Sequence, residues 1–154
     1  MTDLDKDVKN LIDAIQRQDQ MTHSGVVIAA TAIIDNQLER SLKRAMRPMS
    51  KSMYEKLFGA FRPLNTFSSK IAMAYALSII NRDVYNELEK IRKIRNEFAH
   101  SSSVVHFGST AIAPLFGRLK RSSSKSTKPA RVFLECVKAI DAALGEYLGG
   151  TRLP

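Results

Sequence analysis

The stretch VVIAATAIIDNQLERSLKRA, residues 26–45, decides the fold class of this chain. Its apolar residues recur at steps of three and four, which is the spacing of one face of an α-helix. The first half is apolar on every side, as is typical of a helix at the centre of a core, and the second half carries charges on its outer face. We predict a long core helix that follows Ser24-Gly25 and ends before Pro48. Its inner face is predicted to comprise Val27, Thr31, Ile34, Leu38, Leu42 and Ala45.

The rest of the chain shows the same helical period, and no long run alternates with the period of a β-strand. Ser50 precedes a short helix that is expected to stop at Gly59, and Asp83 is the expected N-cap of a helix that ends near His100. An extended piece is expected at Val104 to Phe107. Further helices are expected at about residues 2–15, 66–80, 110–120 and 129–149.

These segments predict an all-α fold, a single-domain helical bundle of about six helices. We expect residues 1–120 to form the core of the bundle, 121–130 a basic Ser/Lys linker, and 131–150 a C-terminal helix that packs on the bundle. With 154 residues the chain is long enough to bury a core that needs no disulfide or metal. The residues expected to be buried together are Ile34, Leu38, Ile71, Tyr75, Leu88, Ile91 and Phe98.

The residue types argue against several classes of site. Cys136 is the single cysteine, so no internal disulfide forms, and its place in an apolar stripe indicates a buried spectator. No Cys/His cluster has the spacing of a zinc site, and no glycine pattern cradles a phosphate. We therefore expect no metal and no cofactor. The acidic start of the chain is unlike a signal peptide, and the apolar run from Val26 to Ile34 is too short to cross a bilayer, so a cytoplasmic protein is expected.

Positive charge is concentrated toward the C-terminus. The net charge is +9, with 16 Lys or Arg against 12 Asp or Glu in residues 1–100 and 8 against 3 in residues 101–154. Such an excess attracts polyanions, although many basic proteins have no such partner. Residues 118–131 contain six basic residues, no acidic residue and many serines, so a mobile linker is expected. If this run binds nucleic acid, the residues that carry it are Arg118, Lys120, Arg121, Lys125, Lys128 and Arg131.

The segment RNEFAH, residues 95–100, is the one stretch whose residue types suggest a catalytic or binding site. Arg95 and His100 would point about 140° apart on a continuous helix. Either the helix unwinds at Ala99-His100, or a second chain completes the pair. Asn96 shares a face with Arg92 and His100, so its amide is a candidate to hold the histidine ring. The plain alternative is a histidine favoured at a helix C-terminus by the helix dipole.

Several segments resemble the mannitol operon repressor family of bacterial proteins. They are FSSKIAMAYAL at 67–77, IRKIRNEFAHS at 91–101, Leu38-Glu39-Arg40 and Ile112-Ala113-Pro114-Leu115. The similarity covers roughly residues 24–120. The resemblance implies an all-helical bundle with a regulatory role in a sugar operon. Because the family carries no recognised helix that reads DNA, it implies a protein or RNA partner rather than direct sequence-specific DNA binding.

The hexapeptide at 95–100 is also similar to the Arg-x4-His signature of HEPN domains, many of which are dimeric RNA-cutting enzymes. This second resemblance implies a metal-independent ribonuclease that acts as a homodimer. His100 would move the proton, Arg95 would stabilise charge on the phosphate, and the RNA would supply its own 2′-hydroxyl. Asp35, Glu39 and Arg92 are candidates to orient the pair, although Asp35 and Glu39 equally fit a solvated helix face. A departure from those enzymes is that we recognise no antitoxin or sensor domain within these 154 residues. The regulator is the favoured interpretation and the ribonuclease is the alternative.

Overall fold

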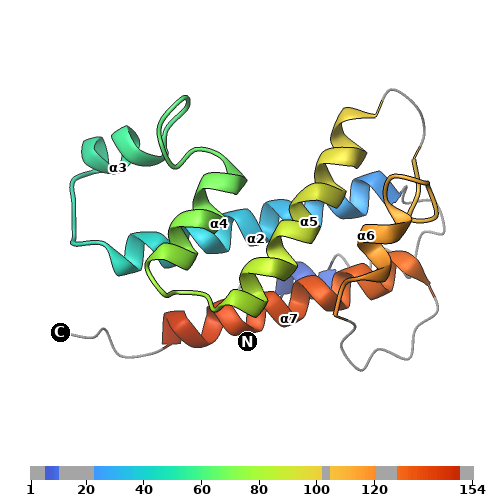
Figure 1. Ribbon diagram of the computed structural model, residues 1–154. Coiled ribbons are helices and arrows are strands. Elements are labelled where there is room, and N and C mark those ends of the chain that lie inside the picture. The colour runs from blue at the N-terminus through green and yellow to red at the C-terminus, as the bar shows by residue number, and fades with distance from the viewer. Residues whose placement is uncertain (1–5, 11–22, 102–104, 121–127, 150–154) are drawn as a thin grey trace.

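The structure is a computed structural model that describes residues 6–10, 23–101, 105–120 and 128–149 (Figure 1). The described residues form helices and no strand, which confirms the all-α prediction. None of these helices is long and apolar enough to cross a membrane. Besides a helical turn at residues 6–10, the helices are α2 (His23–Ala45), α3 (Lys51–Phe58), α4 (Phe67–Ala76), α5 (Arg82–His100), α6 (Ala113–Gly117) and α7 (Pro129–Gly149).

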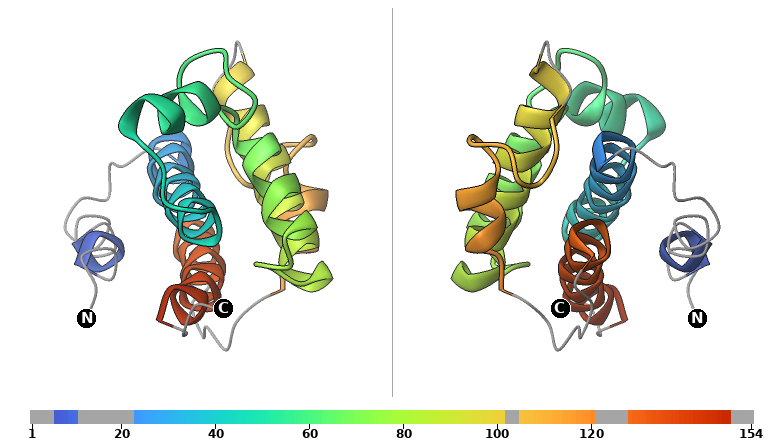
Figure 2. Two further views of the ribbon diagram at one scale, coloured as in Figure 1. Left: turned by 90° about the vertical axis from the view of Figure 1, so that its left-hand side faces the viewer. Right: turned by 90° about the vertical axis from the view of Figure 1, so that its right-hand side faces the viewer.

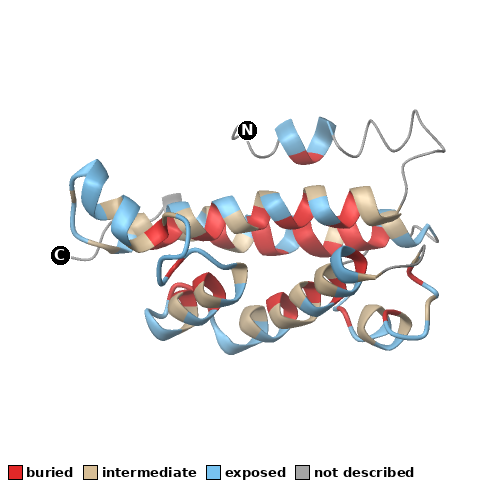
Figure 3. Cartoon of the chain, turned by 90° about the horizontal axis from the view of Figure 1, so that it is seen from above, coloured by how far each residue is buried: buried red, intermediate tan, exposed pale blue. Residues whose placement is uncertain are grey.

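The long helix α2 is the centre of the bundle, because it packs against α4, α5 and α7. Figure 2 shows two layers, with α2 and α7 in one and α4 and α5 in the other. The buried residues of α4 and α5 lie on the side that faces α2, whereas α3 is largely exposed (Figure 3). The short helix α6 packs against α5. The fold therefore leaves α3 at one end of the molecule, joined to the bundle by loops.

Side-chain caps start three of the helices. Ser50, Thr66 and Asn81 each accept a hydrogen bond from a backbone N–H of the following first turn. The prediction that Asp83 caps α5 is wrong, because Asn81 accepts from the Val84 N–H at 2.9 Å. Asp83 instead lies in the first turn of α5, where its negative charge interacts favourably with the positive end of the helix dipole.

The predicted core cluster is largely confirmed. Ile34, Leu38, Ile71, Leu88 and Ile91 are completely buried, and Phe98 is buried as well. The exception is Tyr75, which is partly exposed at the edge of the core. Its ring lies 4.9 Å from that of Tyr85, centroid to centroid.

Two expected boundaries differ from the structure. Helix α4 ends at Ala76 rather than near Ile80, because Ser78 has a φ of 58° and turns the chain while Ile79 and Ile80 stay buried in the link. The expected extended piece does not reach Phe107, which lies in a turn with its ring buried against Phe98, Phe116 and Phe133. Val104 and most of the expected linker, residues 121–127, lie outside the described residues.

Candidate functional site

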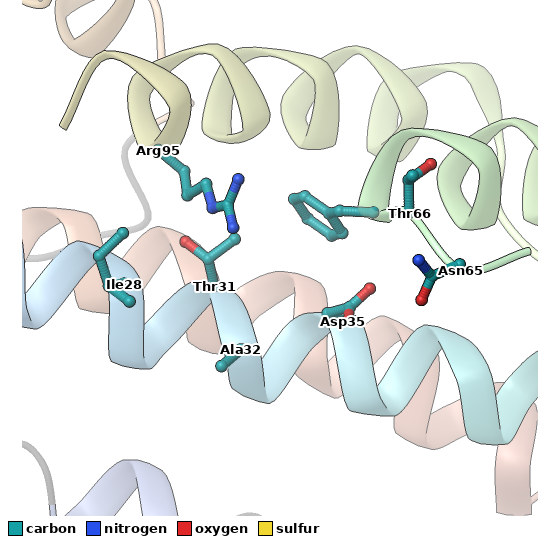
Figure 4. A pocket seen from close by; sticks show the side chains of 8 residues that line it. Ile28, Thr31, Ala32, Asp35, Asn65, Thr66 and Arg95 are labelled. Carbon is teal, nitrogen blue, oxygen red and sulfur yellow. The ribbon is translucent and has the colours of Figure 1, made fainter. Parts of the chain in front are cut away.

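Arg95 and His100 stay on different sides of α5. The helix is continuous through His100 and ends at Ser101, whose N–H donates to the Glu97 carbonyl at 3.2 Å. Unwinding at the end of the helix is therefore excluded. Arg95 is half-buried, and Figure 4 shows its guanidinium reaching toward α2. His100, in contrast, is exposed. One chain alone does not bring the two side chains together.

The polar stripe predicted along α5 is divided between two separate contacts. Nη1 of Arg95 donates a hydrogen bond to Oδ1 of Asn96 at 3.2 Å, so the amide of Asn96 binds Arg95. Among the described residues, no hydrogen bond joins Asn96 to His100. Arg92 donates through Nε and Nη2 to both carboxylate oxygens of Glu89, at 3.1 and 2.8 Å, and this pairing raises the pKa of Arg92.

Asp35 and Glu39 hold a buried lysine. Lys70 of α4 has a side chain only 5% exposed, and its Nζ lies 3.1 Å from Oδ2 of Asp35 and 3.0 Å from Oε2 of Glu39. Glu39 also pairs with Lys43 at 2.7 Å. Burial alone would raise the pKa of Glu39, but the hydrogen bonds from Lys43 and Lys70 outweigh it and lower that pKa. The two carboxylates therefore stabilise the buried charge of Lys70, and among the described residues no hydrogen bond or ion pair joins either of them to Arg95 or His100.

Arg95 and Asp35 nevertheless meet in one pocket between α2, α5 and the start of α4. Figure 4 shows the arginine entering from α5 and the aspartate from α2. The pocket has a volume of about 370 Å³. Oδ1 of Asp35 is buried and has no hydrogen-bond partner among the described residues. The lining residues are Ile28, Thr31, Ala32, Asp35, Asn65, Thr66, Phe67 and Arg95.

The start of the basic run, residues 118–120, is held against α5 by Glu87 and Lys90. This carboxylate is buried, and it accepts from Nζ of Lys90 at 2.6 Å and from the backbone N–H of Lys120 at 2.9 Å. Lys90 also donates to the carbonyl of Arg118 at 3.0 Å. The side chains of Arg118, Lys120, Lys128 and Arg131 are exposed, and Arg121 and Lys125 lie outside the described residues. In the described part of the chain, no group of three or more His, Cys, Asp or Glu side chains is placed to hold a metal.

A second candidate site, on and beside α3, was not anticipated from the sequence. Phe61, in the loop between α3 and α4, is 100% exposed, and Met53 of α3 is 44% exposed. Residues 47–62 also carry four exposed basic side chains against one exposed acidic side chain, Glu55. We call this the α3 surface; it comprises Arg47, Lys51, Met53, Lys56, Phe61 and Arg62.

Backbone hydrogen bonds fix the conformation of the loop that carries Phe61. The N–H of Leu64 donates to the Leu57 carbonyl at 2.8 Å, and that of Arg62 donates to the Gly59 carbonyl at 3.1 Å. Phe61 has a φ of 60°, a left-handed conformation that costs a side-chain-bearing residue about 1–2 kcal/mol. Only glycine fits at position 59, because a Cβ atom there would lie 2.5 Å from the Glu55 carbonyl oxygen. A strained, bonded loop therefore presents a large apolar ring to solvent. The available sequence signal was an aromatic residue in a turn, outside any helical period.

Two comparisons with known proteins bear on this chain, one on its fold and the other on its family. A chain of the X-ray structure of the MtlR–HPr complex from Escherichia coli superposes with a TM-score of 0.67 at 16% identity, covering 89% of this chain and 97% of that chain. At this identity the likeness concerns the fold. No curated protein matches the sequence. Residues 8–145 match the sequence profile described as mannitol repressor, a span longer than the 24–120 of the resemblance above. The chain therefore belongs to the mannitol repressor family.

Proposed function

We propose that this protein is a cytoplasmic regulator of the kind of operon for which its family is named, and that it acts by binding a protein partner. Membership of the mannitol repressor family supports the regulatory role. A solved structure with the same fold is that of a complex of MtlR with HPr, which supports control through a second protein. An HPr-type protein is accordingly the first partner to test.

The observation that carries this proposal is the exposed ring of Phe61. Leaving a phenylalanine in water forgoes about 1.5–3 kcal/mol of burial. Here a left-handed backbone adds to that cost. A folded monomer gains nothing from this arrangement, whereas a partner with an apolar pocket recovers the burial. Large rings at interface centres commonly carry most of the binding energy.

The charges that accompany Phe61 in residues 47–62 indicate the chemistry of that partner. Four basic side chains and one acidic one lie in residues 47–62. Electrostatic complementarity then favours a protein surface with an apolar pocket and an acidic rim. The basic residues would speed encounter, and Phe61 with Met53 would hold the complex.

A reporter experiment in the host bacterium tests the regulatory role. Expression from the promoter of its mannitol operon is compared in the wild type, in a strain that lacks this gene, and in strains that carry variants. Loss of the gene should raise expression, and the wild-type gene should restore repression. Phe61→Ser should fail to restore it, whereas Leu77→Ser, which changes a 46% exposed leucine in the link after α4, should succeed. Expression unchanged by loss of the gene would contradict the proposal.

The alternative function is a metal-independent homodimeric ribonuclease. What favours it is the set of Arg95, in contact with Asn96, and an exposed His100 at the end of the same helix. The divergence of Arg95 and His100 means that a second copy of the chain would have to complete each site. The enzyme should cut single-stranded RNA in EDTA, and His100→Ala should slow cutting by about 10²–10⁴-fold. Wild-type cleavage no faster than that of His100→Ala across varied RNAs would rule the enzyme out.

A further inference from the structure

The two helices that flank the loop carrying Phe61 are both held by contacts that involve Glu39 of α2. Oε1 of Glu39 pairs with Nζ of Lys43 at 2.7 Å, and Oε2 pairs with Nζ of Lys70 at 3.0 Å. Lys70 belongs to α4, the helix that follows the loop (Figure 1). Lys43 belongs to α2 itself, but its charge lies against α3, the helix that precedes the loop. One carboxylate therefore takes part in the contacts on both sides of Phe61.

The contact between Lys43 and α3 is a cation–π contact with two rings. Nζ of Lys43 lies 5.1 Å from the centre of the Phe58 ring and 5.5 Å from that of Tyr54. Phe58 is the buried residue of α3 and the last one of the helix, three positions before Phe61. A cation within about 6 Å of an aromatic ring centre is attracted to the ring face. Lys43 therefore fixes the end of α3 that lies nearest to Phe61 in the chain.

Glu39 is the group that keeps this cation in place. An ion pair between residues four apart on one helix is common and adds little stability by itself. Here, however, the paired ammonium group also contacts two rings of another helix. Without the carboxylate, the flexible lysine side chain would gain the freedom to turn its strongly hydrated charge into water. The ion pair therefore supports the contact with α3.

On the other side of the loop, Lys70 holds the start of α4 against α2. It is the fourth residue of α4, whose N-cap Thr66 ends the loop. Lys70 also pairs with Asp35 at 3.1 Å, so Asp35 would still balance the buried lysine if Glu39 lost its charge. Removal of the Glu39 charge should therefore loosen this contact without leaving a buried charge alone.

The position of Phe61 depends on these two helices. The loop bonds to α3 through the N–H of Leu64, which donates to the Leu57 carbonyl at 2.8 Å, so a tilt of α3 carries the loop with it. Most of α3 is exposed, and its apolar contacts with the core come from Tyr54, Leu57 and Phe58 at its inner face. A helix packed over so small an area is readily reoriented when one of its contacts is removed.

We propose that Glu39 is a positioning residue of the partner site, which acts through Lys43 and Lys70 to keep Phe61 in the orientation that the partner binds. Glu39 itself need not touch the partner. Because the positioned ring belongs to the α3 surface, this role rests on the proposed function. Loss of the orientation should weaken binding in proportion to the fraction of molecules that leave the competent conformation.

Amide hydrogen exchange of the full chain without a partner tests the positioning. In Glu39→Gln, the amides of residues 51–66 should exchange about threefold to tenfold faster than in the wild type, whereas those of α5 should be unchanged. A loss of stability of the whole bundle would instead speed exchange in α5 as well. Lys43→Met should speed exchange in residues 51–66, and Lys43→Arg, which can keep both the ion pair and the ring contacts, should leave it slow.

Glu89→Gln is the matched control. Glu89 is 24% exposed, close to the 26% of Glu39, and it pairs with Arg92 on α5, which does not flank the loop. This variant should leave exchange in residues 51–66 as it is in the wild type.

Calorimetric titration with the HPr protein of the same bacterium connects the positioning to partner binding. Glu39→Gln should bind about threefold to tenfold more weakly than the wild type, and Glu89→Gln should bind equally well. Two results would overturn the role of Glu39 and leave the proposed function standing: unchanged exchange in residues 51–66 of Glu39→Gln, or wild-type affinity of that variant while Phe61→Ser binds weakly. Absence of binding by the wild type would contradict the proposed function, and the role of Glu39 with it.

Discussion

Lys70 of α4 lies 3.1 Å from the carboxylate of Asp35 on α2, a residue 35 positions earlier in the chain. The contact fixes α4 against the central helix and turns one oxygen of Asp35 away from the lysine and into a buried position without a donor. Asp35 therefore contributes both to the contact between α2 and α4 and to the wall of the pocket that Arg95 enters.

Removal of the buried lysine charge should destabilise the protein. Lys70→Met keeps an apolar stem but leaves Asp35 and Glu39 facing each other without their shared cation. We expect the free energy of unfolding to fall by about 1–3 kcal/mol, less than for a fully buried pair because the carboxylates are partly exposed. Lys43→Met, which removes a more exposed partner of Glu39, should cost below about 1 kcal/mol. Urea titration measures both, and equal losses would contradict this role of Lys70.

Truncation inside the core should be far more damaging than truncation at its edge. Ile91 is completely buried on α5, so Ile91→Ala should lower the free energy of unfolding by about 2–5 kcal/mol. Leu77 is 46% exposed, and Leu77→Ala should cost under about 1 kcal/mol. A loss below about 0.5 kcal/mol for Ile91→Ala would show that this face is not the core.

His23 should make stability depend on pH. Its Nδ1 accepts from the N–H of Phe107 at 3.3 Å, and its pKa is lowered by burial and by the nearby His106. Because the unfolded chain then binds the proton more tightly, stability is complete above the ordinary pKa of 6.5 and falls as the pH drops toward the lower folded value. Thermal unfolding of the wild type between about pH 7.5 and pH 5.5 should show this fall. His23→Asn should show a smaller fall, and an equal fall in both would assign it to other groups.

The strain at Phe61 should be measurable without a partner. Phe61→Gly removes the exposed ring and relieves the left-handed backbone, whereas Phe61→Ala removes the ring alone. We expect the glycine variant to be more stable than the alanine variant by about 1 kcal/mol in urea titration. A glycine variant less stable than the alanine variant would show that the backbone at residue 61 carries no strain.

The helices were predictable because their signals are local. The apolar period of residues 26–45 places α2, and Ser50 precedes α3 where a cap is needed. The predicted cap Asp83 was wrong, because Asn81 two residues earlier is an equally good cap and its side chain is the one that accepts from the N–H of Val84. Local sequence therefore predicts that a helix is present more reliably than it predicts the residue at which the helix begins.

The contacts of the candidate sites were not predictable, because they join distant segments. Nothing near Asp35 in the sequence indicates that its partner is Lys70, the single charged residue of α4. The spacing of Arg95 and His100 correctly indicated that a continuous helix separates them, but not that Arg95 would enter a pocket. Full exposure of Phe61 depends on a loop conformation that composition does not encode.

The central claim, that the protein works through a partner bound at the α3 surface, is tested most directly by calorimetric titration of the purified chain with the HPr protein of the same bacterium. The wild type should bind, and Phe61→Ser should bind at least about tenfold more weakly, since a buried ring at an interface commonly contributes 2 kcal/mol or more. Leu77→Ser, which likewise replaces an exposed apolar side chain by serine but lies outside the α3 surface, should bind like the wild type. Absence of binding by the wild type, or equal affinity of the wild type and Phe61→Ser, would contradict the claim.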